Sequence, residues 1–141
     1  MKALDFAKAF GVAFASLLIT MAASFPMVTF YAYFIEPGQS QEFYTEAAQW
    51  IAPWSSYILG PIVFFAFNYW LARRSPERNA AVFAVATIGF YLAIDLSFVP
   101  IMGLDIGIFL TAGMAFWLAV KLAGALLGAH LGSRGKQVAS V

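Results

Sequence analysis

Two aspartates interrupt a stretch that is otherwise apolar enough for a membrane interior, the segment FYLAIDLSFVPIMGLDIGIF at residues 90–109. A carboxyl group inside a bilayer is costly, and it usually belongs to a proton or ion pathway or has a charged partner. Pro100 disfavours helical geometry at Val99, so we expect a helix to end there and Asp105 to cap the next helix. That structural role leaves Asp95 as the residue whose chemistry needs an explanation.

Asp95 is expected one turn before a helix end, where the helix dipole disfavours a carboxylate. The nearest basic residue along the neighbouring helix is Lys121, which we expect at least ~15 Å away, with its side chain reaching toward the inner membrane surface. Asp95 is therefore expected to be protonated, hydrated, or paired with an external cation or with a partner protein.

Hydroxyl groups occur at helical spacing near the expected level of Asp95. Thr87, Tyr91 and Asp95 share one face of a helix. Ser16, Thr20 and Ser24 form a similar stripe on the first apolar segment. Hydroxyls around a carboxylate are the groups that bind protons or small cations, so these six residues are the predicted proton or cation site. The alternative is that both stripes only pack helices together.

The composition excludes a water-soluble globular domain. Of the 141 residues, 62% are hydrophobic and 11% are charged, against roughly 45–50% and 25% in ordinary soluble domains. The chain has no cysteine and one histidine, His130, so thiol chemistry is absent and a histidine metal site would need several copies of the chain. We expect no cofactor, no metal site and no nucleic-acid partner.

Four apolar runs, near residues 9–35, 51–72, 80–102 and 106–132, each reach the ~20 residues that span a bilayer. The predicted fold class is an all-α integral membrane protein, one membrane domain over residues 1–141 with four transmembrane helices in an up-down bundle. The first run also has signal-peptide features, but its length favours a membrane span.

Basic residues predict the orientation of these spans. All eight lie before the first span, between the second and third, or in and after the fourth. The positive-inside rule therefore predicts that both termini are cytoplasmic, with residues 133–141 as a cytoplasmic tail, and that residues 36–50 face outward.

The outward segment 36–50 begins with Pro37 and Gly38, which stop the first helix. Apolar residues then recur at helical spacing through Phe43, Ala47 and Trp50. This pattern predicts a short helix that lies in the membrane interface between the first two spans.

The fourth span carries glycines at every fourth position, Gly124, Gly128 and Gly132. Such a stripe lets another backbone approach closely. The partner could be a helix of the same chain, a second copy or another membrane subunit.

Two functions follow from these observations. The first is a noncatalytic accessory or assembly subunit that packs through the glycines of the fourth span, within a homo-oligomer or against another membrane protein. The second is an oligomeric transporter or channel for protons or small cations that uses Asp95. An enzyme has no positive support, since no nucleotide loop, nucleophile elbow or zinc motif is present.

Overall fold

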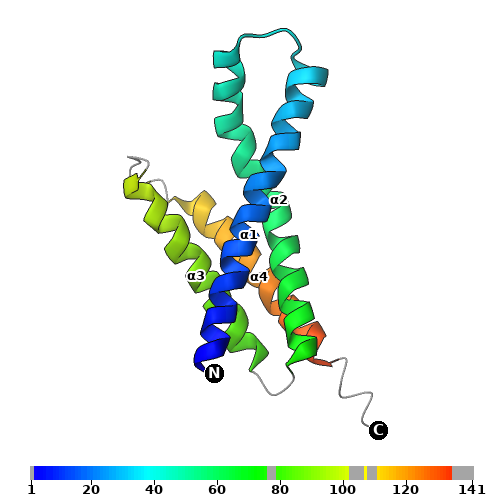
Figure 1. Cartoon of the computed structure of the whole chain (residues 1–141), viewed down its shortest axis with the longest axis vertical. Coiled ribbons are helices and arrows are strands. Elements are labelled where there is room, and N and C mark those ends of the chain that lie inside the picture. The colour runs from blue at the N-terminus through cyan, green and yellow to red at the C-terminus, as the bar shows by residue number, and fades with distance from the viewer. Residues whose placement is uncertain (1, 76–78, 102–106, 108–110, 135–141) are drawn as a thin grey trace.

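The computed structural model describes residues 2–75, 79–101, 107 and 111–134 (Figure 1). This part of the chain contains four long helices and no strand. Each helix is long and apolar enough to cross a membrane, so the prediction of a four-helix, multi-pass membrane protein is confirmed at that level. The helices are α1 (Ala3–Phe30), which continues as the π-helix η1 (Tyr31–Ile35), α2 (Gln41–Arg74), α3 (Ala80–Ile101) and α4 (Ala112–Arg134).

The first two helices form a long hairpin. Gly38 has φ 81° in the turn, a left-handed conformation that glycine adopts without a steric penalty. The Ser40 hydroxyl then caps α2 by accepting a hydrogen bond from the Phe43 N–H at 3.3 Å. The Tyr44 hydroxyl closes the turn, because it donates to the Glu36 carbonyl at 2.7 Å and accepts from the Gln39 N–H at 3.0 Å.

The structure has no separate interfacial helix at residues 36–50. Helix α2 runs without interruption from Gln41, so residues 41–50 are its first turns. The apolar spacing was read correctly as helical, but no helix breaker separates it from the next span. Ala47 of the predicted interfacial segment is buried, and so is Ile51 of the predicted second span. The two residues lie one turn apart on the same face of α2.

The predicted third span, 80–102, agrees with α3 within one residue, but the helix end expected at Val99 and the start of the fourth helix differ from the prediction. Helix α3 includes Pro100 and ends at Ile101, so the predicted end at Val99 is wrong. A proline removes one backbone hydrogen bond, which a membrane helix tolerates when neighbouring groups compensate. Helix α4 begins at Ala112 instead of residue 106. The predicted helix cap, Asp105, lies outside the described residues.

The first two helices are longer than the last two. At 1.5 Å per residue, α1 with η1 and α2 are each ~50 Å long, whereas α3 and α4 are only ~33–35 Å. The α1–α2 turn therefore extends past the shorter helices (Figure 1). We call this the hairpin end, and the end where α1 begins and α4 finishes the terminal end.

The core lies at the level where all four helices meet. Helix α4 packs mainly on α2, and α3 packs on α1 and α4. Helix α4 contributes only alanines to the main buried cluster, α2 contributes a phenylalanine, and α1 and α3 contribute both small and large side chains. The main buried cluster is Ala13, Leu17, Phe64, Ala84, Ile88, Tyr91, Ala125 and Ala129. Many large apolar side chains point outward instead, as expected for a surface that faces lipid.

Candidate functional site

A lysine side chain lies inside the helix assembly. Lys121 on α4 is only 6% exposed. Its Nζ donates hydrogen bonds of 2.8 Å to the Tyr91 hydroxyl on α3 and to the Ser56 hydroxyl on α2. The same Nζ lies 4.5 Å from the centre of the Tyr91 ring. Lys121 therefore joins three helices through one charged group.

A glycine on α2 makes room for the lysine. A Cβ atom placed on Gly60 would lie 2.8 Å from Cε of Lys121, closer than side-chain carbons approach one another. The aliphatic part of Lys121 thus passes directly over the Gly60 backbone on its way to Ser56. Any side chain at position 60 would displace the ammonium group or move the helices apart.

Tyr91 is the central residue of the cluster. Its side chain is 4% exposed, and its ring packs edge-on against Phe64 with 5.2 Å between ring centres. Its hydroxyl accepts from Lys121 and lies 3.3 Å from the Ser56 hydroxyl. This packing fixes the hydroxyl at the point where α2, α3 and α4 meet.

Asp95 lies one helical turn from Tyr91 on α3 and is half-buried. Its carboxyl group interacts with the Tyr91 hydroxyl and with the charge of Lys121. A phenol has one proton to donate and lone pairs to accept, so Tyr91 can accept from Lys121 while it donates to Asp95. The three side chains can therefore act as a hydrogen-bonded series from an ammonium group to a carboxylate.

An aromatic pair lies beside this series, one turn from Lys121. Trp117 on α4 stacks on Tyr57 of α2, with ring centres 4.6 Å apart and planes within 4°. The Tyr57 hydroxyl donates to the sulfur of Met114 at 3.5 Å. These contacts hold α2 and α4 together next to Ser56 and Lys121.

The sequence-based placement of Lys121 was wrong. Its side chain does not extend toward the inner surface, and it is not remote from Asp95. Lys121 lies nine residues into α4, ~14 Å from the start of that helix, while Asp95 lies ~9 Å before the end of α3. The two residues are therefore at similar levels, because α4 begins later and α3 ends later than the prediction assumed.

The remaining predicted site residues do not join the Lys121 cluster through any hydrogen bond that the described part of the chain shows. Thr87 is buried and its hydroxyl donates to the Phe83 carbonyl of its own helix. Thr20 donates to Ser16 O and Leu17 O on α1, and Ser24 donates to Met21 O. These bonds are typical of hydroxyls in membrane helices.

The stripe on α1 nevertheless contacts α2. Ser55 on α2 directly precedes Ser56, and its hydroxyl donates a hydrogen bond to the Thr20 carbonyl at 2.9 Å. The Ser16 hydroxyl is fully buried and has no hydrogen-bond partner among the described residues. The α1 stripe therefore forms a polar contact with α2 through the Thr20 carbonyl, one residue along α2 from the Lys121 partner Ser56.

The glycines of α4 lie against the α2 backbone of the same chain. A Cβ on Gly124 would lie 2.5 Å from the Pro61 carbonyl oxygen, and Cβ atoms on Gly128 and Gly132 would overlap the carbonyl oxygens of Phe65 and Tyr69. Lys121, three residues before Gly124, faces the same helix over Gly60. Lys121 lies on the same face of α4 as the three glycines, because it precedes Gly124 by three residues. This spacing is the sequence feature that could have predicted that Lys121 faces α2.

The other groups considered from the sequence show no site. His130 is exposed near the end of α4, and no cluster of three metal-ligating side chains occurs among the described residues. Comparison of the chain with family models, with curated proteins and with solved structures finds no match.

Proposed function

We propose that this protein is a small integral membrane transporter that moves protons through a centre formed by Lys121, Tyr91 and Asp95. The observation that carries the proposal is the burial of Lys121 among three membrane-spanning helices, with its ammonium group bonded to Tyr91 and Ser56. Ionisable residues inside membrane segments are rare, and proton relays are one of their main uses.

The arrangement supports proton transfer between two titratable groups. Lys121 can give a proton from Nζ to the Tyr91 oxygen as Tyr91 gives its own proton to Asp95. The result is a neutral amine, an unchanged phenol and a neutral carboxylic acid, so no charge is gained or lost. The reverse steps restore the charged ammonium and carboxylate groups, and each state presents different charges to the surrounding helices.

The relay also links the four-helix core to one end of the molecule. Lys121 is enclosed, whereas Asp95 is half-buried and lies closer to the end of α3. A proton that reaches Asp95 from that side can be passed inward through Tyr91. Asp95 is therefore the member of the series that lies nearer to a helix end, so exchange of its proton with solution has the shorter path there.

The alternative role, an accessory subunit that assembles through the α4 glycines, has less support. Those glycines lie against α2 of the same chain, where their backbone is in close contact with Pro61, Phe65 and Tyr69. A partner subunit would have to use another face. The accessory role also gives no functional reason for a buried lysine, whose removal from water is energetically costly.

A flux assay tests the proposal. The protein is reconstituted in vesicles that contain a pH-sensitive dye, and a potassium diffusion potential drives protons across the membrane. We expect the wild type to raise proton flux above that of empty vesicles, and Asp95→Asn and Lys121→Met to remove the increase. Lys8→Met, the same change outside the cluster, should retain it.

Folding of each variant is checked by circular dichroism and size-exclusion chromatography before flux is measured. Equal flux in wild-type and empty vesicles would contradict a proton pathway. Flux that survives both Asp95→Asn and Lys121→Met in folded protein would place the pathway elsewhere.

A further inference from the structure

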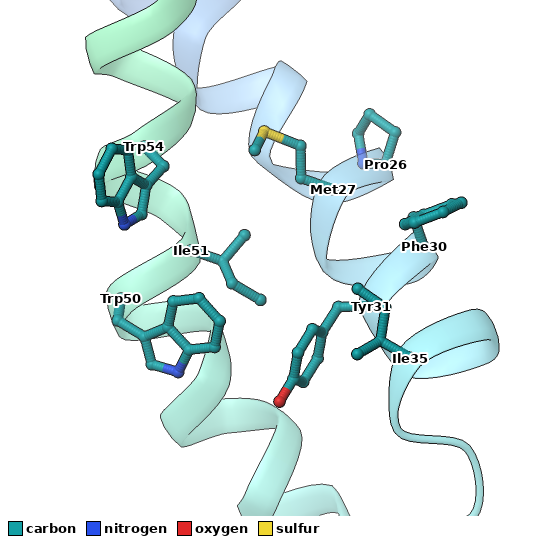
Figure 2. A pocket seen from close by; sticks show the side chains of 8 residues that line it. All are labelled: Pro26, Met27, Phe30, Tyr31, Ile35, Trp50, Ile51 and Trp54. Carbon is teal, nitrogen blue, oxygen red and sulfur yellow. The ribbon is translucent and has the colours of Figure 1, made fainter.

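A second feature, independent of the lysine cluster, is an apolar groove near the hairpin end. It lies between α1 with η1 on one side and α2 on the other, and its volume is about 450 Å³. Figure 2 shows Met27 and Tyr31 on one side of it and Trp50 and Ile51 on the other, and Phe30 and Trp54 complete its rim. Volumes of roughly 300–1,000 Å³ are usual for sites that enclose small ligands.

The walls of the groove suit a hydrocarbon chain. The lining side chains are aliphatic or aromatic, and their few polar atoms are the Tyr31 hydroxyl and the two indole nitrogens. Both walls belong to helices that are apolar enough to span a membrane, so we expect the groove to open on lipid. Tyrosine and tryptophan concentrate at the level of lipid headgroups, which places there the rim of the groove that lies nearest the α1–α2 turn.

The charge around the hairpin end is entirely acidic. Between Lys8 and Arg73 the chain has no basic residue, and its three charged residues there are Glu36, Glu42 and Glu46. Glu36 directly follows the groove residue Ile35, and Glu46 lies one helical turn before Trp50. An ammonium group at this rim would be attracted by carboxylates and by aromatic ring faces, whereas an anionic headgroup would be repelled.

We infer that this groove binds one acyl chain of a phospholipid whose headgroup carries an ammonium group, with that group facing Glu36 and Glu46. The inference does not depend on proton transport. It assigns the hairpin end a lipid-binding role, in which the chain occupies the space between α1 and α2 and the headgroup remains at the membrane surface.

Native mass spectrometry of the whole protein tests the inference. The protein is equilibrated with an equimolar mixture of phosphatidylcholine and phosphatidylglycerol that have identical acyl chains, and retained lipids are counted. We expect one lipid per chain to be retained, with phosphatidylcholine favoured several-fold. Retention of no lipid, an equal ratio of the two, or a bound polypeptide in place of lipid would overturn the inference.

Two sets of variants locate the bound lipid. Met27→Phe fills the groove and should abolish retention, whereas Met21→Phe changes an exposed residue of the same helix outside the groove and should not. The double change Glu36→Gln with Glu46→Gln should keep one lipid but remove the preference for phosphatidylcholine. Equal retention by Met27→Phe and Met21→Phe would show that the lipid binds elsewhere. An unchanged preference in the glutamine variant would contradict the headgroup assignment.

Discussion

The ammonium group of Lys121 lies 2.8 Å from the phenol oxygen of Tyr91, in the part of the molecule where all four helices meet. Tyr91 in turn interacts with Asp95, so one hydroxyl connects a buried base to an acid on the next turn of α3. A charge that is removed from water is strongly destabilising unless it is compensated. The cluster therefore makes three side chains dependent on one another, and this dependence can be measured.

Lys121→Met and Asp95→Asn should be non-additive in their effects on stability. Each single change leaves the other charge without its partner, so each should lower the free energy of unfolding. The double variant removes both charges and should recover part of the loss, with a coupling free energy of about 0.5–3 kcal/mol. Equilibrium unfolding in mixed micelles measures all four proteins of this double-mutant cycle. Lys8→Met combined with Asp95→Asn is the control pair and should be additive. Additivity of the Lys121 pair would contradict an interaction between the two charges.

Gly128→Leu should destabilise the folded chain itself. A side chain at this position would collide with the Phe65 carbonyl of α2, so the two helices would have to separate. We expect the free energy of unfolding to fall by about 1–3 kcal/mol. Gly113→Leu makes the same change on α4 at a position with no atom within 4 Å, and it should have little effect. Thermal unfolding in detergent distinguishes them, and similar midpoints for the two variants would mean that α4 does not pack on α2 in this register.

Single cysteines at Gln41 and Ser75 should report opposite sides of the membrane. The distribution of lysine and arginine predicts that Gln41, at the hairpin end, faces outward and that Ser75, at the end of α2, faces the cytoplasm. The chain has no native cysteine, so each introduced thiol is unique. An impermeant maleimide applied to intact cells should label position 41 alone. Labelling of position 75 alone would reverse the orientation.

The sequence was sufficient for the features that depend on long apolar runs. Four helices follow from segments that exceed the bilayer thickness, and the spacing of Phe43, Ala47 and Trp50 predicts the helical conformation of that segment but not its continuity with α2. Helix ends were less predictable. Pro100 disfavours a helix only locally, and the structure accommodates it inside α3.

The cluster itself could be predicted only in part. Tyr91 and Asp95 were paired by their spacing on one helix, which is a local property. Their contact with Lys121 and Ser56 depends on how α2, α3 and α4 are rotated about their axes, and residue types alone do not determine that rotation. Gly60 was overlooked because a single glycine in a membrane helix carries no signal until the side chain that crosses it is known.

The most direct test of the account is whether Asp95 exchanges protons with solution from inside the folded protein. Infrared difference spectra of the reconstituted wild type, recorded between acidic and alkaline buffer, report the gain and loss of a protonated carboxyl band. The account predicts a reversible band that disappears in Asp95→Asn and shifts in Tyr91→Phe, but stays unchanged in Tyr33→Phe, which alters an exposed tyrosine. A spectrum of Asp95→Asn that matches the wild type would contradict the proposed proton centre.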